Sequence, residues 1–248
     1  MSSDSNLDFV GDNPGAVRHG NFINYYQFHP ASERIEKLPT DIWRCSRNKG
    51  EKFVCLDIGC NTGDLTEQVL NFLKENLTTD DGMKPEIHMV GIDLDQNLIS
   101  RANEKFNSTR DLEFLTIDAA KETLDSLLKI ALSHDVPKFG AVFLMSVTMW
   151  VHLVNGDEAF QEFLKKSGDL TDRWLVIESQ PWKCYRSAQR RLVSSGEAGF
   201  EFYSKLTIKG DKIQPFVDKV LSEECGMSKV FETDPSKWNR TICIYKKR

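Results

Sequence analysis

The sequence predicts an α/β fold built on a mostly parallel sheet, and three observations carry that prediction. From residue 52 onward, short apolar runs of strand length alternate with longer segments whose apolar positions have helical spacing. The first apolar run enters a turn bracketed by Gly59 and Gly63 and then a helix. Four of the runs end at an acidic residue, namely Asp57, Asp93, Asp118 or Glu178. Because helical crossovers make such strands parallel, these acids are expected at one edge of the sheet.

The strands and helices are expected in a regular order up to residue 178. We expect strands at 53–58, 87–92, 112–117, 139–145 and 173–177, with helices at 64–76, 95–106, 121–133 and 157–166 between them. The last part of the chain has a helix at 214–224 and two strand-like runs, at 228–232 and 241–245, with turn residues between them. These two runs predict an antiparallel C-terminal hairpin that completes a seven-stranded sheet.

The chain is expected to form one domain preceded by a tail. Its 248 residues, of which 40% are hydrophobic and 28% charged, are enough for a full core. Residues 1–19 are polar and are expected to be a disordered tail. Residues 20–50 are expected to form an N-terminal arm, and residues 51–248 the α/β core. The aromatic stretch of the arm, at 20–30, either covers the core or acts as a lid that faces a ligand, and both can hold.

The net charge, the cysteines and the histidines exclude several classes of protein for this sequence. The net charge of -5 provides no global positive field for nucleic acid, so any RNA site must be a local basic patch. The first residues lack the pattern of a signal peptide, and no apolar run is long enough to cross a bilayer. The six cysteines contain no C-x-x-C pair and the five histidines show no ligand spacing, so we expect no metal site. We expect a cytoplasmic protein that is a monomer and does not bind membranes.

The turn after the first strand predicts a cofactor with a positive centre. Its two glycines are four residues apart, unlike the first two of the dinucleotide-binding pattern G-x-G-x-x-G. A Cβ atom at Gly59 would block the backbone from approaching a ligand. The carboxylate of Asp57 suits a positive centre and would repel a pyrophosphate. The alternative is a glycine-containing turn that binds no ligand.

The spacing D-x-G-x-x-x-G resembles the first motif of S-adenosylmethionine-dependent methyltransferases. The C-terminal hairpin resembles the last strand pair of the class I (Rossmann-like) sheet of these enzymes. The resemblance implies S-adenosyl-L-methionine as the cofactor and S-adenosyl-L-homocysteine as the product.

The acids at the strand ends can be assigned to parts of this cofactor, because a ligand of an open α/β sheet lies across the carboxyl ends of the strands. We expect Asp57 and Asn61 to line its amino-acid half and Asp93 to bind both ribose hydroxyls. Asp118 and Ala119 are placed for the adenine edge. For Asp93 the alternative is a helix N-cap. The cofactor residues expected here are Asp57, Gly59, Asn61, Gly63, Asp93, Asp118 and Ala119.

A basic run follows the fifth strand and predicts an anionic substrate. Lys183, Arg186, Arg190 and Arg191 occur there with no acid among them. Lysine and arginine recognise phosphate, and the run borders the methyl end of the expected cofactor. Arg186 and Arg190 would share one face of a helix. For Arg190 and Arg191 the alternative is a solvated helix face.

Several stretches together resemble the bicoid-interacting-protein family of RNA 5′-phosphate methyltransferases. They are G-N-F-I-N-Y-Y-Q-F-H-P at 20–30, L-D-I-G-C-N-T-G-D-L at 56–65, M-S-V-T-M-W-V-H-L at 145–153, G-D-E at 156–158 and Q-P-W-K-C-Y-R at 180–186. The resemblance is closest to the cytoplasmic branch that methylates RNA 5′-monophosphates, a branch linked to histidine tRNA and small-RNA precursors. The other branch caps the γ-phosphate of a nuclear small RNA and has an arginine in place of His29. Ser179 departs from the family, which usually has proline there.

This resemblance adds site residues and a mechanism. It implies cofactor contacts from Arg34, Asn61, Asp93, Asp118, Ala119 and Met145. A phosphate oxygen needs no general base, because a phosphate monoester with a second pKa of about 6 is largely dianionic at neutral pH. We therefore expect Tyr25, His29, His152 and Lys183 to position the phosphate. For His152 the alternative is a buried histidine whose hydrogen bonds are satisfied.

Three other functions are weighed against this one. The first is a methyltransferase that acts on a protein or a small molecule. The second is the γ-phosphate methyltransferase of a 5′-triphosphate small nuclear RNA. The third is an RNA-binding module with a vestigial cofactor site, which the acids at the strand ends disfavour because unused buried acids cost desolvation.

Overall fold

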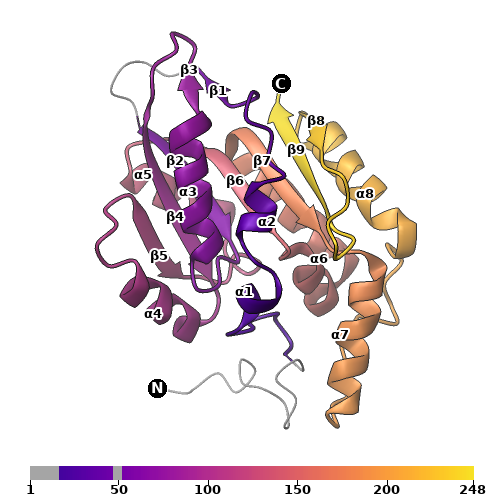
Figure 1. Ribbon diagram of the computed structural model, residues 1–248. Helices are drawn as coiled ribbons and strands as arrows, with labels where there is room; N and C mark the ends of the chain where they lie inside the picture. Colours follow the sequence, from indigo (N-terminus) through magenta and orange to yellow (C-terminus); the bar gives the residue numbers. More distant parts are fainter. Residues whose placement is uncertain (1–16, 47–51) are drawn as a thin grey trace.

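The centre of the fold is a seven-stranded sheet that confirms the predicted architecture (Figure 1). The computed structural model describes residues 17–46 and 52–248. The strands lie in the order β5-β4-β2-β6-β7-β9-β8, and β9 runs antiparallel to both of its neighbours while the other pairs are parallel. The strands are β2 (Lys52–Ile58), β4 (Glu86–Asp93), β5 (Leu112–Thr116), β6 (Phe139–Met145), β7 (Thr171–Ser179), β8 (Met227–Glu232) and β9 (Thr241–Lys247). A separate two-stranded sheet pairs β1 (Arg44–Cys45) with β3 (Thr78–Thr79).

The helices cover both faces of the sheet, as Figure 1 shows with α3 in front and α5 and α6 behind. They are α1 (Tyr25–Phe28), α2 (Ser32–Ile35), α3 (Asp64–Asn76), α4 (Gln96–Lys105), α5 (Leu124–Ser133), α6 (Thr148–Leu170), α7 (Trp182–Ser194), a 3-10 turn (Gly210–Lys212), α8 (Ile213–Lys219) and a π-helical turn (Val220–Glu224). Successive residues of β2 point to opposite faces, so Val54 packs in the core under α5 and α6 and Phe53 in the core under α3. Both faces are therefore buried, which explains the continuous apolar run of β2.

The main difference from the predicted elements lies around α6. The prediction starts a helix at 157, but the chain enters α6 at Thr148, directly after β6. Gly156, with φ 85°, interrupts the helical backbone inside α6, so the predicted helix corresponds only to the second part. The basic run also forms a complete helix, α7, which projects from the body of the domain (Figure 1).

The N-terminal arm packs on the sheet. The part of the predicted tail at 1–16, and the part of the arm and core boundary at 47–51, lie outside the described residues. Residues 17–19 contact the domain, since Val17 is buried and Arg18 Nη2 lies 2.5 Å from Glu197 Oε2. The division into tail, arm and core stays a prediction. Among the described residues, no helix has the length and apolar character that spanning a membrane requires.

The strand register brings the site residues together. Asp57 lies opposite Gly91, Met145 lies opposite Glu178, and Ser179 lies opposite Thr241. Because β9 runs antiparallel to β7, the turn that precedes β9 reaches the same edge as the carboxyl ends of the parallel strands. The edge is therefore formed by the ends of the parallel strands and by the start of β9.

Candidate active site

A first hollow, called here the acidic pocket, lies across the carboxyl ends of β2, β4, β5 and β6. The predicted cofactor residues that line it are Asp57, Gly59, Asn61, Asp93, Asp118, Ala119 and Met145. Residues of the arm, among them Asn21, Tyr25 and Tyr26, line the opposite side. Among the lining residues that the structure describes there are three carboxylates and neither lysine nor arginine.

The turn after β2, which contains Gly59 and Asn61, lines the acidic pocket. Gly59 has a φ of 80°, and its N–H donates to the carbonyl oxygen of Ile92 at 2.8 Å. A Cβ atom at Gly59 would lie 3.0 Å from Val147 Cγ2 and would require a strained backbone. Asn61 also has a positive φ, of 53°, which asparagine tolerates better than most residues. Glycine and asparagine at these positions therefore allow the tight turn that lines the acidic pocket.

Asp93 is held in place by two backbone donors and keeps capacity for a ligand. Its Oδ2 accepts from the N–H of Asn61 and its Oδ1 from the N–H of Asp95, both at 3.0 Å. Each carboxylate oxygen can accept a second bond, so two ribose hydroxyls can be accommodated. The N-cap of α4 is Asp95, whose Oδ1 accepts from the N–H of Asn97, so the N-cap alternative does not apply to Asp93.

Burial raises the pKa of both strand-end carboxyls that face the turn. The pKa of Asp57 rises to about 6, and that of Asp93 also to about 6, because burial penalises their charged forms. The hydroxyl of Thr66 donates to Asp57 Oδ2 at 2.7 Å and favours the ionised form. A positively charged ligand would replace the lost solvation of these carboxylates. The residues present therefore fit S-adenosyl-L-methionine, which carries a sulfonium and an ammonium group.

The arm closes over the acidic pocket through three hydrogen bonds. Asn21 Nδ2 donates to Asp95 Oδ2 at 2.8 Å, Asn61 Nδ2 to the carbonyl of Phe22 at 3.0 Å, and the Tyr26 hydroxyl to the carbonyl of Cys60 at 3.2 Å. About 80 Å³ of free space remains below it. Ligand pockets usually measure about 300–1,000 Å³, so this free space is smaller than that of an ordinary ligand pocket. Further along the arm, Ala31, Leu38 and Trp43 are part of the core, so the arm covers the core, and its role as a lid stays a prediction.

Two predicted cofactor residues do not line the acidic pocket. Gly63 precedes α3 with φ 79°, and a Cβ atom there would lie 2.6 Å from Phe114 Cζ, so this glycine serves packing. Arg34 is 2% exposed and its Nε donates to both carboxylate oxygens of Glu178, at 3.1 and 3.2 Å. The fold uses Arg34 to neutralise the buried acid at the end of β7.

A second hollow, called here the basic pocket, adjoins the first and encloses about 740 Å³. Its charged lining residues are Lys183, Arg191, Lys237 and Arg240, with no carboxylate among the lining residues that the structure describes. Tyr25 and His29 also line it, as do aromatic side chains that include Phe28 and Trp238. The basic pocket therefore suits an anion attached to a larger group with stacking surfaces.

Tyr25 and Trp150 line both pockets and mark their junction. The hydroxyl oxygen of Tyr25 accepts from Arg34 Nη2 at 2.7 Å and from Arg240 Nη1 at 2.9 Å. Arg240 Nη1 also donates to Ser146 Oγ at 2.8 Å and lies 3.7 Å from Glu178 Oε2. Two guanidinium groups thus surround one carboxylate. The excess positive charge lies at the junction, where the Tyr25 hydroxyl proton remains available for an anion.

Helix α7 divides the predicted basic residues between two faces. Lys183 and Arg191 are two turns apart and line the basic pocket. Arg186 and Arg190 share an exposed face, as the spacing predicts, but that face does not line the pocket. The N-terminus of α7 lies beside the pocket through Pro181 and Lys183, and helix N-termini attract anions.

The two predicted histidines have different surroundings. His29 is half-buried against Trp238, and burial together with Arg240 and Arg34 lowers its pKa to about 4. It is therefore neutral at pH 7 and offers an uncharged N–H to a phosphate. His152 lines neither pocket and is fully buried, with Nδ1 3.1 Å from the Tyr185 hydroxyl and Nε2 2.7 Å from Asp157 Oδ1. The structure does not bring His152 to the site and matches the alternative of a satisfied buried histidine.

Sequence reasoning did not assign Lys237, Trp238 and Arg240 to the site. The sequence signal for this segment is a turn between two strand-like runs. Only the place of β9 beside β7 brings that turn to the carboxyl edge, and a strand order cannot be read from local patterns. The signal that could have revealed these three residues is the presence of two cations directly before the last strand of the predicted hairpin.

Comparisons with known proteins identify the family of the chain. A 5′-monophosphate methyltransferase of pre-miRNA from Danio rerio is 35% identical over 246 residues, covering 96% of this chain and 95% of the relative. The chain belongs to the bicoid-interacting protein 3 family. The model of that family, described as Bicoid-interacting protein 3 (Bin3), matches residues 139–247, and one described as a methyltransferase domain matches residues 56–170. A second relative, the RNA 5′-monophosphate methyltransferase of Bos taurus, is 35% identical. The match covers 94% of this chain and 82% of that relative.

Solved structures show the same fold at low sequence identity. An O-methyltransferase family protein from Burkholderia thailandensis has a TM-score of 0.57 at 12% identity, covering 92% of this chain and 58% of that one. The magnesium protoporphyrin IX methyltransferase of Synechocystis with bound SAH has a TM-score of 0.54 at 16% identity, covering 91% and 85%. The family and the matched domain confirm the prediction of a methyltransferase that uses S-adenosyl-L-methionine. The solved structures confirm the class I fold.

Proposed function

We propose that the chain methylates the 5′-monophosphate of an RNA, with S-adenosyl-L-methionine as the methyl donor. The observation that carries this proposal is the contact of two pockets of opposite charge at Tyr25 and Trp150. The relatives named RNA 5′-monophosphate methyltransferase support the choice of the acceptor. We expect the enzyme to be a cytoplasmic monomer that acts on RNAs such as histidine tRNA or small-RNA precursors.

In this proposal the acidic pocket holds the donor. Asp57 and Asn61 would hold its amino-acid half, Asp93 the ribose hydroxyls, and Asp118 with Ala119 the adenine edge. The bound cofactor supplies a methyl group on an electrophilic sulfonium. The arm excludes water from this pocket once Asn21 has bonded Asp95.

The basic pocket holds the acceptor. Lys183, Arg191, Lys237 and Arg240 supply the charge that a phosphate dianion needs, and Tyr25 and His29 supply neutral donors. Each charge-assisted hydrogen bond contributes about 1.5–3 kcal/mol. Phe28, which is 72% exposed, and Trp238 offer ring faces on which a terminal base can stack.

No residue is required as a general base. The phosphate oxygen is already ionised at neutral pH, since the second pKa of a phosphate monoester is about 6. The residues at the junction have to align acceptor and donor, and alignment of this kind contributes about 7–11 kcal/mol at best. Tyr25, fixed by two arginines, is the residue best placed to set the phosphate position.

A set of RNAs that differ only at the 5′ end tests the proposal. The RNA would carry a hydroxyl, a monophosphate or a triphosphate, and methyl transfer from labelled cofactor would be measured. We expect transfer to the monophosphate, and the methylated end should resist phosphatase because its phosphate has become a diester. Equal transfer to the hydroxyl form would contradict the proposal, and preferential transfer to the triphosphate would favour the γ-phosphate alternative.

A further inference from the structure

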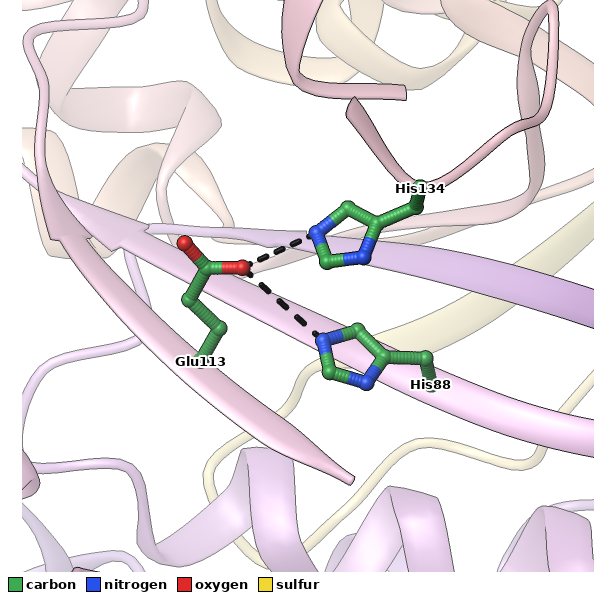
Figure 2. Close-up of side chains that lie close together, drawn as sticks. All are labelled: His88, Glu113 and His134. Atoms are coloured by element: carbon green, nitrogen blue, oxygen red, sulfur yellow. Dashed lines mark hydrogen bonds and ion pairs between the residues drawn. The ribbon is translucent and has the colours of Figure 1, made fainter. Parts of the chain in front are cut away.

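Three side chains that have no role in the proposed reaction converge on one side of the sheet (Figure 2). His88 belongs to β4, Glu113 to the edge strand β5, and His134 follows the last residue of α5. His88 and Glu113 lie near the amino-terminal starts of their strands, whereas the acidic pocket lies at the carboxyl ends. The cluster is therefore separate from the active site.

Both imidazole rings direct Nε2 at one carboxylate oxygen. Figure 2 shows the two contacts with Glu113 Oε2, which is 2.9 Å from Nε2 of His134 and 3.9 Å from Nε2 of His88. The ring centroids are 4.3 Å apart with an interplanar angle of 33°. His134 can form a hydrogen bond at this distance, but Nε2 of His88 is buried and forms none. The protein alone gives Nε2 of His134 a hydrogen bond and leaves Nε2 of His88 without one, which costs free energy.

We propose that His88, Glu113 and His134 bind a zinc ion. Two imidazole nitrogens and one carboxylate oxygen form a ligand set that zinc uses in proteins. A tetrahedral ion with ligands at about 2.0–2.2 Å requires its donor atoms to be about 3.4 Å apart. The three donor atoms here lie within 4.8 Å of one another, with two measured separations of 2.9 and 3.9 Å on either side of that value. Small rotations of the side chains are enough to form the site.

The ligand types suit the metal at neutral pH. An imidazole with its ordinary pKa of about 6.5 is mostly neutral at pH 7 and can donate a lone pair to an ion. Glu113 has a side-chain exposure of 39%, so the fourth position of the ion opens toward solvent and takes water. Such a site would join β4, β5 and the end of α5. It would stabilise the edge of the sheet and would exchange its ion with solution.

The sequence does not predict this site, because its ligands are distant in the chain and show no regular spacing. The parallel pairing of β4 with β5 brings His88 and Glu113 onto one face, and the crossover through α5 returns the chain to them at His134.

Zinc titration of the full chain tests the proposal. The protein would be stripped with a chelator, dialysed and titrated with zinc chloride by calorimetry, and cobalt chloride would report tetrahedral coordination through its visible absorption. We expect one equivalent of zinc to bind and the melting temperature to rise by roughly 5 °C at a hundredfold excess over Kd. Magnesium chloride is expected to have no effect, because imidazole ligands do not suit magnesium.

Variants separate this site from adventitious binding. His88→Asn and His134→Asn are expected to lower zinc affinity at least tenfold and to abolish the cobalt spectrum. Glu86→Gln, on the same strand but outside the cluster, is the matched control and is expected to bind zinc as the unchanged chain does. Circular dichroism would verify that each variant is folded. Zinc binding that survives both histidine substitutions, or no binding at micromolar zinc by the unchanged chain, would overturn the proposal.

Discussion

The acidic pocket and the basic pocket share Tyr25 and Trp150 but are built from different parts of the fold. The ends of the parallel strands provide the carboxylates of the first. Helix α7 and the turn before β9 provide the cations of the second, and the arm adds the uncharged side chains of Tyr25 and His29. The difference teaches that the sheet supplies the carboxylates of one pocket, while elements added around one edge supply the cations of the other. Under the proposed function, the first choice sets the cofactor and the second the acceptor.

The largest expected effect is the loss of the charge in the acidic pocket. Asp57→Asn keeps the shape and the contact with Thr66 but removes the carboxylate. We expect cofactor affinity to fall about 10- to 100-fold, the value of one hydrogen bond to a charged group. Calorimetry with S-adenosylhomocysteine measures this. Asp125→Asn, an exposed carboxylate of α5, is the control, and equal losses for both variants would show that the pocket assignment is wrong.

The pH dependence of cofactor binding follows from the raised pKa of Asp57. Its pKa of about 6 in the free protein lies above the ordinary value of 3.8, so the folded chain holds this proton more tightly than the unfolded chain. The carboxyl therefore lowers the free energy of unfolding as pH rises from about 4 to 6. Bound positive charge favours the ionised form, so affinity should fall about tenfold from pH 7 to pH 5. Asp57→Asn should bind with a weaker pH dependence, the rest of which comes from Asp93, and an unchanged pH profile in this variant would contradict the argument.

The basic pocket can be weakened without touching the cofactor. Lys183→Ala removes one cation from an exposed position, and we expect kcat/KM for a 5′-phosphorylated RNA to fall about tenfold or more. Affinity for S-adenosylhomocysteine should stay within about twofold. Arg190→Ala, on the same helix but outside the pocket, should leave both values nearly unchanged. If the two variants lost activity equally, α7 would act only through its overall positive charge, and the specific role of Lys183 in the basic pocket would be contradicted.

The sequence predicts the residues of the acidic pocket better than those of the basic pocket, because the two pockets depend on different kinds of contact. Asp57, Asp93 and Asp118 occur at strand ends, and strand ends can be read from the alternation of apolar runs. Lys237 and Arg240 reach the site only because β9 inserts beside β7, a contact between segments distant in the chain. For Arg34, type and spacing did not reveal its bond to Glu178, a contact between segments distant in the chain, and its contact with the cofactor stays a prediction.

The smallest effect on catalysis is expected at His152, outside both pockets. His152→Leu leaves the Tyr185 hydroxyl and Asp157 without this partner, which should lower the free energy of unfolding by about 1–3 kcal/mol. Thermal or urea denaturation measures the loss. The kcat of the remaining folded enzyme should be nearly unchanged. A large fall in kcat with unchanged stability would show that His152 takes part in positioning the phosphate after all.

The most direct measurement compares the binding of one RNA with and without its 5′-phosphate, in the presence of S-adenosylhomocysteine. The unchanged chain should bind the phosphorylated form at least tenfold more tightly. The double variant Lys183→Ala, Arg191→Ala should lose this preference while binding S-adenosylhomocysteine normally. If the preference survived in the double variant, or if cofactor binding were lost with it, the assignment of donor and acceptor to separate pockets would be contradicted.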